Sequence, residues 1–216
     1  MKIVLFGATG NIGRRIAAEA LRRGHEIVGV VRDPVAVQSP DPGVTLVKGD
    51  ATDPKSVGSI VRDADAVVSA LSPRPNARGL AAPSLAANAR ALIAGLRDAG
   101  VKRVLYVGGA SSLEVAPGQM LADLPDFPDA YKAEAQEGRE ALAVWRSEAA
   151  GLDWTYVSPA AEIGPGERTG IYRTTGDQLL VDAAGKSFIT LEDYAVAVLD
   201  ELERPQHVAR RFGVAY

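Results

Sequence analysis

The chain of 216 residues contains no cysteine, and it also lacks any long run of apolar residues. Without thiols it cannot form disulfides, use a thiolate nucleophile, or bind zinc or an iron–sulfur cluster through sulfur. The lack of cysteine is compatible with a reducing compartment, and we expect a cytoplasmic protein. No stretch approaches the roughly 18 apolar residues of a membrane span. Residues 3–6 are too few for the hydrophobic region of a signal peptide, so neither secretion nor a membrane partner is predicted.

Histidine is scarce as well, with only His25 and His207. Two histidines so far apart in the sequence offer little to a Ser-His-Asp site or a histidine-rich metal centre, and we expect both at the surface. The aspartates Asp123, Asp126 and Asp129 lack the ligand order of a calcium loop. The sequence therefore predicts no metal site.

A strong excess of charge of either sign is absent too. The 24 basic residues are interspersed among 27 acidic ones, and the net charge is −3. No basic stripe is present, so nucleic acid is not an expected partner. The length suits one hydrophobic core, and we expect a single domain over residues 1–216.

A glycine-rich segment near the amino terminus is the most informative feature that is present. Gly7-Ala8-Thr9-Gly10-Asn11-Ile12-Gly13 directly follows the apolar residues 3–6 and opens an amphipathic helical pattern. A strand, a glycine-rich turn and a helix in this order form the context of a dinucleotide-binding motif. We expect Gly7 to allow the turn, Gly10 to admit the diphosphate, and Gly13 to let the helix pack closely. The spacing differs by one residue from G-x-G-x-x-G, so the match is to a variant of that motif.

Strand and helix patterns alternate along the rest of the chain. Strands are expected at residues 3–6, 27–31, 44–47, 66–69, 104–107 and 154–157. Helices are expected at residues 12–23, 54–61, 83–99, 130–149 and 191–203. This alternation predicts an α/β fold with a doubly wound, mainly parallel sheet covered on both faces. Residues 160–190 are rich in glycine, with short β-like pieces at 170–173 and 178–181, and we expect a small hairpin lobe there that contacts substrate or is only a surface loop.

The end of the second predicted strand bears on the choice of cofactor. Arg32 lies there, about 20 residues after the glycine motif, where the ribose of the adenosine half is recognised. A guanidinium pairs well with a 2′-phosphate, so NADP(H) is favoured over NAD(H). If the carboxylate of Asp33 faces the ribose instead, NAD(H) fits. A further alternative is that Arg32 is only a solvated surface charge.

The ends of the later strands supply the other candidate contacts. Asp50 is placed to accept from the adenine amino group, with the backbone of Ala51 beside the ring, although Asp50 could instead cap the next helix. We assign that capping role to Asp53. Carboxyl ends of parallel strands line the ligand crevice of such sheets. The residues expected to surround the nicotinamide ribose are Ser69, Ala70, Leu71 and Gly108.

Taken together, these segments resemble the atypical short-chain dehydrogenases/reductases over nearly the whole chain. Residues 108–113 and 189–195 look most like the NAD(P)H-binding, NmrA-like group, which includes NADH–flavin reductases and the biliverdin reductase B type. The resemblance implies a Rossmann fold, with Ser111 near the nicotinamide and with Pro159 and Ala160 against its carboxamide side.

One departure from the larger family affects the expected mechanism. Catalytic short-chain dehydrogenases use Tyr-x-x-x-Lys, in which the lysine lowers the pKa of the tyrosine. The nearest match begins at Tyr131, but Ala135 stands where the lysine should be and Lys132 projects about 100° away around the helix. A standard alcohol dehydrogenase or epimerase is therefore disfavoured.

Flavin reduction depends less on a protein acid, because solvent can protonate the delocalised anion. We therefore expect an NAD(P)H-dependent reductase that passes hydride to a planar acceptor such as a flavin, with Ser111 and Tyr131 as the candidate catalytic residues. Phe127 and Tyr172 are further aromatic candidates for the acceptor site. The alternative is a non-enzymatic NADP(H)-binding sensor of the NmrA type, and an epimerase or dehydratase is weaker still. The sequence does not decide the oligomeric state, and both a monomer and a dimer stay open.

Overall fold

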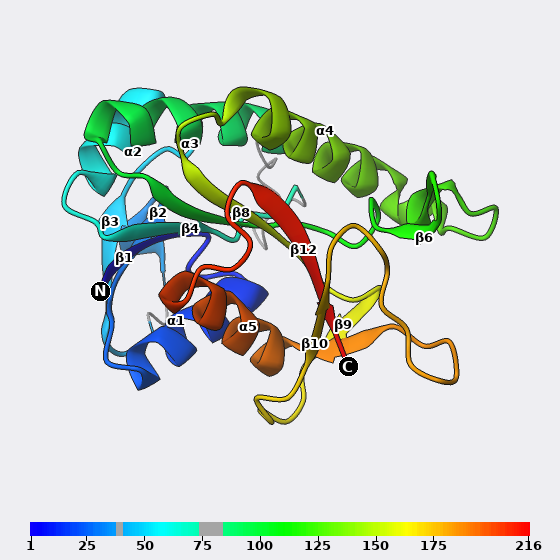
Figure 1. Ribbon diagram of the computed structural model, residues 1–216. Helices are drawn as coiled ribbons and strands as arrows, with labels where there is room; N and C mark the ends of the chain where they lie inside the picture. Colours follow the sequence, from blue (N-terminus) through cyan, green and yellow to red (C-terminus); the bar gives the residue numbers. More distant parts are fainter. Residues whose placement is uncertain (38–40, 74–83) are drawn as a thin grey trace.

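The computed structural model describes residues 1–37, 41–73 and 84–216. Within them, an eight-stranded sheet passes through the middle of the molecule, between a layer of three helices and a layer of two (Figure 1). The strand order is β10-β12-β8-β5-β4-β1-β2-β3. Of the pairs formed by described residues in this sheet, only β10 with β12 is antiparallel. The predicted α/β fold with a doubly wound, mainly parallel sheet is confirmed.

The strands of the main sheet are β1 (Lys2–Phe6), β2 (Glu26–Val31), β3 (Val44–Lys48), β4 (Ala66–Ser69), β5 (Arg103–Val107), β8 (Asp153–Ser158), β10 (Arg173–Thr175) and β12 (Arg210–Ala215). The helices are α1 (Asn11–Arg22), α2 (Pro54–Val61), α3 (Leu85–Ala99), α4 (Lys132–Glu148) and α5 (Leu191–Glu203). Two short pairs lie outside the main sheet, β6 (Glu114–Ala116) with β7 (Gln119–Met120) and β9 (Glu162–Gly164) with β11 (Phe188–Thr190). Short 3₁₀ turns occur at Pro34–Ala36, Leu121–Asp123 and Asp129–Tyr131.

The two faces of the sheet bury two separate apolar clusters. One cluster packs α2, α3 and α4 against the sheet, and the other packs α1 and α5 against the opposite face (Figure 1). Strands that are covered on both faces have apolar residues at nearly every position. The strands β1, β2, β4 and β5 are therefore recognisable in the sequence as continuous apolar runs. Asp53 caps α2 by accepting from the Lys55 N–H at 3.0 Å, as predicted. Within the described residues, no helix combines the length and apolarity that crossing a bilayer requires.

The expected helices and strands are present, with small shifts at their ends. The helix predicted at 83–99 begins at Leu85, and Pro83 lies outside the described residues. The helix predicted at 130–149 begins at Lys132, because a 3₁₀ turn occupies the residues just before it. β12 was not predicted, since its sequence opens with Arg210 and Arg211 and contains a glycine.

The hairpin predicted within residues 160–190 is wrong. Of its first piece, predicted at 170–173, only Arg173 lies in a strand, β10, which pairs with β12 and not with residues 178–181. In the second piece, Gln178 instead forms a parallel bridge with Glu114. A long strand with a free edge offers β10 a better partner than a short neighbouring segment, and the pairing also covers that edge.

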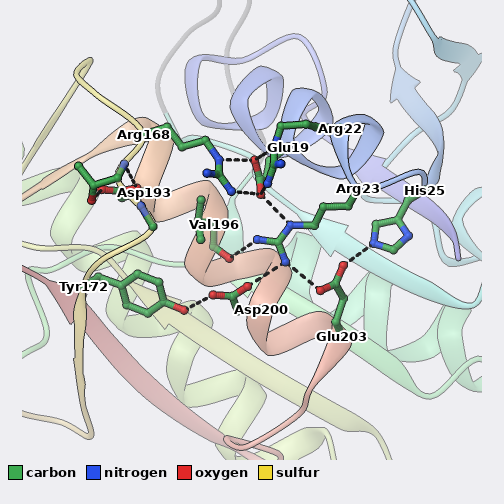
Figure 2. A network of polar contacts seen from close by, with 12 residues as sticks. Glu19, Arg22, Arg23, His25, Arg168, Tyr172, Asp193, Val196, Asp200 and Glu203 are labelled. Atoms are coloured by element: carbon green, nitrogen blue, oxygen red, sulfur yellow. Dashed lines mark hydrogen bonds and ion pairs between the residues drawn. The ribbon is translucent and has the colours of Figure 1, made fainter.

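A buried polar network ties the segment before β10 to the α1 and α5 face. The carboxylate of Glu19 is only 4% exposed and accepts hydrogen bonds from Arg22, Arg23 and Arg168. Burial opposes the charge on Glu19, but these arginines hold its pKa well below its ordinary value. Figure 2 shows that Arg23 continues the network to Asp200 and Glu203 on α5, while Tyr172 reaches Asp200 from the lobe.

Both histidines were expected at the surface, but the structure shows them partly buried and hydrogen-bonded. His25 joins this network through Glu203 at 2.7 Å, with its side chain only 11% exposed (Figure 2). His207 contacts Glu201 at 2.8 Å and stacks on Phe212. Both rings are therefore structural parts of the C-terminal packing.

Candidate functional site

The glycine-rich loop between β1 and α1 is shaped by two close backbone contacts. Gly7 has φ 82°, and a Cβ on it would lie 2.5 Å from the Ala70 carbonyl oxygen. A Cβ on Gly13 would lie 2.1 Å from the Gly7 carbonyl oxygen. No side chain fits at either position, so Gly7 and Gly13 are required by the packing of the loop against β4 and α1.

Gly10 differs, because it has space for a larger residue among the described residues. Within that part of the chain and outside its own turn, an added Cβ would have the Gly7 carbonyl oxygen as its only neighbour within 4 Å, at 3.2 Å. Gly10 is the N-cap of α1, no side chain caps the helix, and no acidic residue lies in its first turn. Such a terminus presents backbone N–H groups and the positive end of the helix dipole to an anion. This cradle fits the diphosphate of a dinucleotide.

Two neighbours of the cradle are also held in place. The guanidinium of Arg15 donates to the carbonyl oxygen and the side-chain oxygen of Asn11, at 3.2 and 2.5 Å. Ile12 packs partly buried against the α1 and α5 cluster. The cradle lies where the strand order reverses, between β1 and β4, which is the usual ligand position in such sheets.

A buried amide connects the next strand ends. Asn88 of α3 is fully buried, donates from Nδ2 to the Ala51 carbonyl oxygen at 2.7 Å, and accepts from the Ser69 hydroxyl at 3.3 Å. Two predicted cofactor residues are thus brought together through a residue that the sequence analysis missed. The available signal was a lone amide on the alanine-rich buried face of α3. Gly7 also lies against Ala70 and Leu71, so the β4 end contacts the glycine loop.

The residues predicted to contact the adenosine half lie at the surface of the described structure. Arg32 and Asp50 are both exposed, just beyond β2 and β3. The Asp50 carboxylate accepts from the Thr52 hydroxyl and N–H at 2.7 and 2.8 Å, and these bonds, with a smaller contribution from Arg32, lower the pKa of Asp50. Asp50 therefore shapes its own turn, and its contact with adenine stays a prediction.

At the other end, the loop after β5 rests on Tyr156. A Cβ on Gly108 would overlap the Tyr156 ring at 1.9 Å, so only glycine fits beneath that ring. The Tyr156 hydroxyl donates to the Gly138 carbonyl oxygen of α4 at 3.1 Å. Burial raises the pKa of Tyr156 to about 12, so the hydroxyl stays protonated at neutral pH. A Cβ on Gly138 would lie 3.8 Å from this hydroxyl and 3.9 Å from Ser111 Oγ, so both hydroxyls lie close to Gly138 of α4.

Three more predicted residues lie at the start of α4 and directly after β8. Tyr131 is the N-cap of α4 and is 47% exposed, while Ala135, at the position of the family's lysine, is buried. Pro159 and Ala160 directly follow β8, the neighbour of β5. Ser158, the last residue of β8, is fully buried, and its hydroxyl has no hydrogen-bond partner among the described residues. In residues 1–37, 41–73 and 84–216, no cluster of metal-ligating side chains is present.

The fold and this cradle define a Rossmann-type nucleotide-binding protein. The sequence model of the NAD(P)H-binding family matches residues 7–205, and the chain belongs to that family. Bacillus subtilis YwnB, an uncharacterised protein, is 40% identical over 99% of this chain and 98% of its own length. A structure from Burkholderia pseudomallei, described as a candidate exported protein, is 47% identical with a TM-score of 0.89, and each chain is covered completely. A candidate NADH-flavin reductase from Streptococcus pneumoniae TIGR4 is 31% identical with a TM-score of 0.81, over 100% of this chain and 99% of its own.

Proposed function

We propose that this protein is an NAD(P)H-dependent reductase that delivers hydride to a planar acceptor such as a flavin. The observation that carries the proposal is the uncapped N-terminus of α1 at Gly10, combined with a β5 loop that presents Ser111 beside α4. The similarity to the streptococcal protein supports a flavin as the acceptor.

The chain's own residues hold the cofactor in this proposal. The N–H groups at Asn11 and Ile12 bind the diphosphate, while Gly10, whose own N–H donates to the Gly7 carbonyl oxygen at 2.9 Å, leaves room for it, and Thr9 and Gly13 shape the loop. Arg32 binds the 2′-phosphate, Asp50 and Ala51 contact the adenine, and Pro159 and Ala160 contact the carboxamide. Ser69, Ala70, Leu71 and Gly108 surround the nicotinamide ribose, as proposed from the sequence.

The reaction needs positioning more than acid catalysis. When bound, NAD(P)H supplies a hydride, which a planar acceptor takes up together with a proton from solvent. The Ser111 hydroxyl orients the acceptor or the carboxamide, and the ring of Tyr131 supports the acceptor, while residues 160–190 form its cover. No tyrosine–lysine pair is required, which agrees with the buried Ala135.

The proposal is tested by following nicotinamide absorbance with purified protein, NADPH or NADH, and FMN, FAD, riboflavin, biliverdin or a quinone under low oxygen. We expect saturable, protein-dependent oxidation with at least one acceptor. The absence of the tyrosine–lysine pair also suits a non-enzymatic NADP(H) sensor. Tight NADPH binding without turnover for any acceptor would support that sensor and overturn the reductase.

Replacing Arg32 by alanine is expected to weaken NADPH binding at least tenfold and NADH binding less than threefold. A guanidinium–phosphate contact is a charge-assisted pair of about 1.5–3 kcal/mol, and NADH lacks the 2′-phosphate. Titration calorimetry with both nucleotides measures the difference. Arg62→Ala, at the far end of α2 and 61% exposed, serves as the control. Equal losses for both nucleotides would contradict the preference for NADP(H).

The cytoplasmic location also stays a proposal, since one similar protein is described as exported. Fractionation of cells that produce the full chain decides between the compartments.

A further inference from the structure

Arg211 is a buried arginine in the last strand, and the function proposed above gives it no role. Its side chain is only 2% exposed, and in the register of β12 with β8 it stands opposite Tyr156. A buried guanidinium is tolerated only when hydrogen bonds replace its lost hydration. The contacts it makes should therefore show what it holds in place.

Those contacts join the loop after β5 to the lobe. Nη1 donates to the carbonyl oxygen of Ser112 at 2.9 Å and to its hydroxyl at 2.8 Å. Nε and Nη2 bind the carboxylate of Asp177, at 2.7 and 2.5 Å. The rigid fork of an arginine reaches these two groups at once, which the single ammonium of a lysine cannot do.

The held loop is the one that carries Ser111. Ser112 is buried and adjoins Ser111, whose carbonyl oxygen accepts from the Ala122 N–H at 2.9 Å. Asp177 belongs to the lobe, and its carbonyl oxygen accepts from the Glu114 N–H at 2.8 Å, just past the same loop. Arg211 thus sets the position of the β5 loop relative to the proposed acceptor cover.

We propose that Arg211 is a positioning residue, which fixes the Ser111 loop through Ser112 and fixes the lobe through Asp177. The effect on turnover rests on the proposed reductase function, whereas the effect on the loop does not. Arg211 touches no reacting atom in this proposal. Its influence reaches the nicotinamide end of the site and leaves the adenosine end unchanged.

The chain offers a matched control in Arg146 of α4. Arg146 Nη2 also binds Asp177, at 2.7 Å, but it does not contact Ser112 in the described structure. Arg211→Lys and Ser112→Ala test the proposed contact, and Arg146→Met tests the loss of a cation beside Asp177. Ser112→Ala removes a single hydroxyl and tests the same contact if the lysine of Arg211→Lys destabilises the fold.

Three measurements separate the outcomes. Hydrogen exchange of a peptide covering residues 108–113 should be at least tenfold faster in Arg211→Lys than in the parent, and unchanged in Arg146→Met. The nicotinamide fluorescence of bound NADPH should change in Arg211→Lys, while the affinity for ADP and 2′-phospho-ADP stays within twofold. With an active acceptor, kcat should fall at least tenfold and KM for NADPH less than threefold. Ser112→Ala should shift each quantity in the same direction by less.

Unchanged exchange of residues 108–113 in folded Arg211→Lys would overturn the proposal, as would equal effects of Arg146→Met. If none of the acceptors supports NADPH oxidation by the parent protein, the proposed reductase function fails. Hydrogen exchange and nicotinamide fluorescence then still decide the role of Arg211. If the parent does not bind NADPH either, exchange alone decides it.

Discussion

Replacing Gly10 by alanine is expected to weaken NADPH binding at least about 100-fold while the protein stays folded. Among the described residues the added methyl group meets only the Gly7 carbonyl oxygen, at 3.2 Å, so the loop needs a shift of a few tenths of an ångström. The same methyl group stands over the uncapped end of α1 and displaces the diphosphate. Loss of two charge-assisted hydrogen bonds of about 1.5–3 kcal/mol each accounts for the factor. Titration calorimetry and thermal melting measure affinity and fold together.

Two further glycine variants complete that experiment. Gly13→Ala places a Cβ 2.1 Å from the Gly7 carbonyl oxygen, and we expect it to lower the free energy of unfolding by about 2–3 kcal/mol without any ligand present. Gly176→Ala is the control, because in the part of the chain that the structure describes its Cβ would have only Gln178 Oε1 within 4 Å, at 3.8 Å. If Gly10→Ala bound NADPH as tightly as the parent protein, the diphosphate would not lie at this helix terminus.

Replacing Glu19 by glutamine is expected to lower the free energy of unfolding by about 3–5 kcal/mol. The glutamine keeps the shape of the side chain but leaves Arg22, Arg23 and Arg168 facing a neutral amide. Removing the carboxylate of a buried ion-pair network has an effect of this size, because Arg22 and Arg168 lose the charge that compensates them, while Arg23 keeps Asp200 and Glu203. Chemical denaturation at neutral pH measures the change.

The same variant should remove part of the acid sensitivity of the fold. The pKa of Glu19 is lower in the folded protein than its ordinary value of about 4.3, so its contribution is complete above that value and is lost as the pH falls. Glu148→Gln is the control, since its ion pair with Arg90 is exposed and should contribute less than about 1 kcal/mol. A loss below 1 kcal/mol in Glu19→Gln would mean that the three arginines regain water.

Much of the fold is readable from the sequence, because strands buried on both faces and amphipathic helices leave regular patterns. β12 was not predicted because its first two residues are arginines. The charge of Arg211 is compensated by Ser112 and Asp177, which are 99 and 34 residues away in the chain. β10 was expected to pair locally, but its partner is this same unpredicted strand. Local patterns cannot reveal a strand whose polar residues are compensated at long range.

In the candidate site, too, residues with local roles were predicted and residues with long-range roles were missed. The glycine loop was predictable since its chemistry is local, and Asp53 was assigned correctly as a cap for the same reason. Asn88 and Tyr156 were missed as site residues, because their roles depend on which strand ends they reach across the sheet. The roles of Ser111 and Tyr131 remain predictions that only turnover and ligand binding can test.

The insertion of β12 between β10 and β8 has a consequence for the order in which the molecule folds. β12 pairs with both β8 and β10, and it follows both of them in the chain. Because synthesis proceeds from the N-terminus, β10 has no partner in the sheet until β12 has been made. The strands around the glycine loop are therefore complete before the Ser111 loop is fixed. The last strand to dock completes the half of the molecule where the acceptor is proposed to bind.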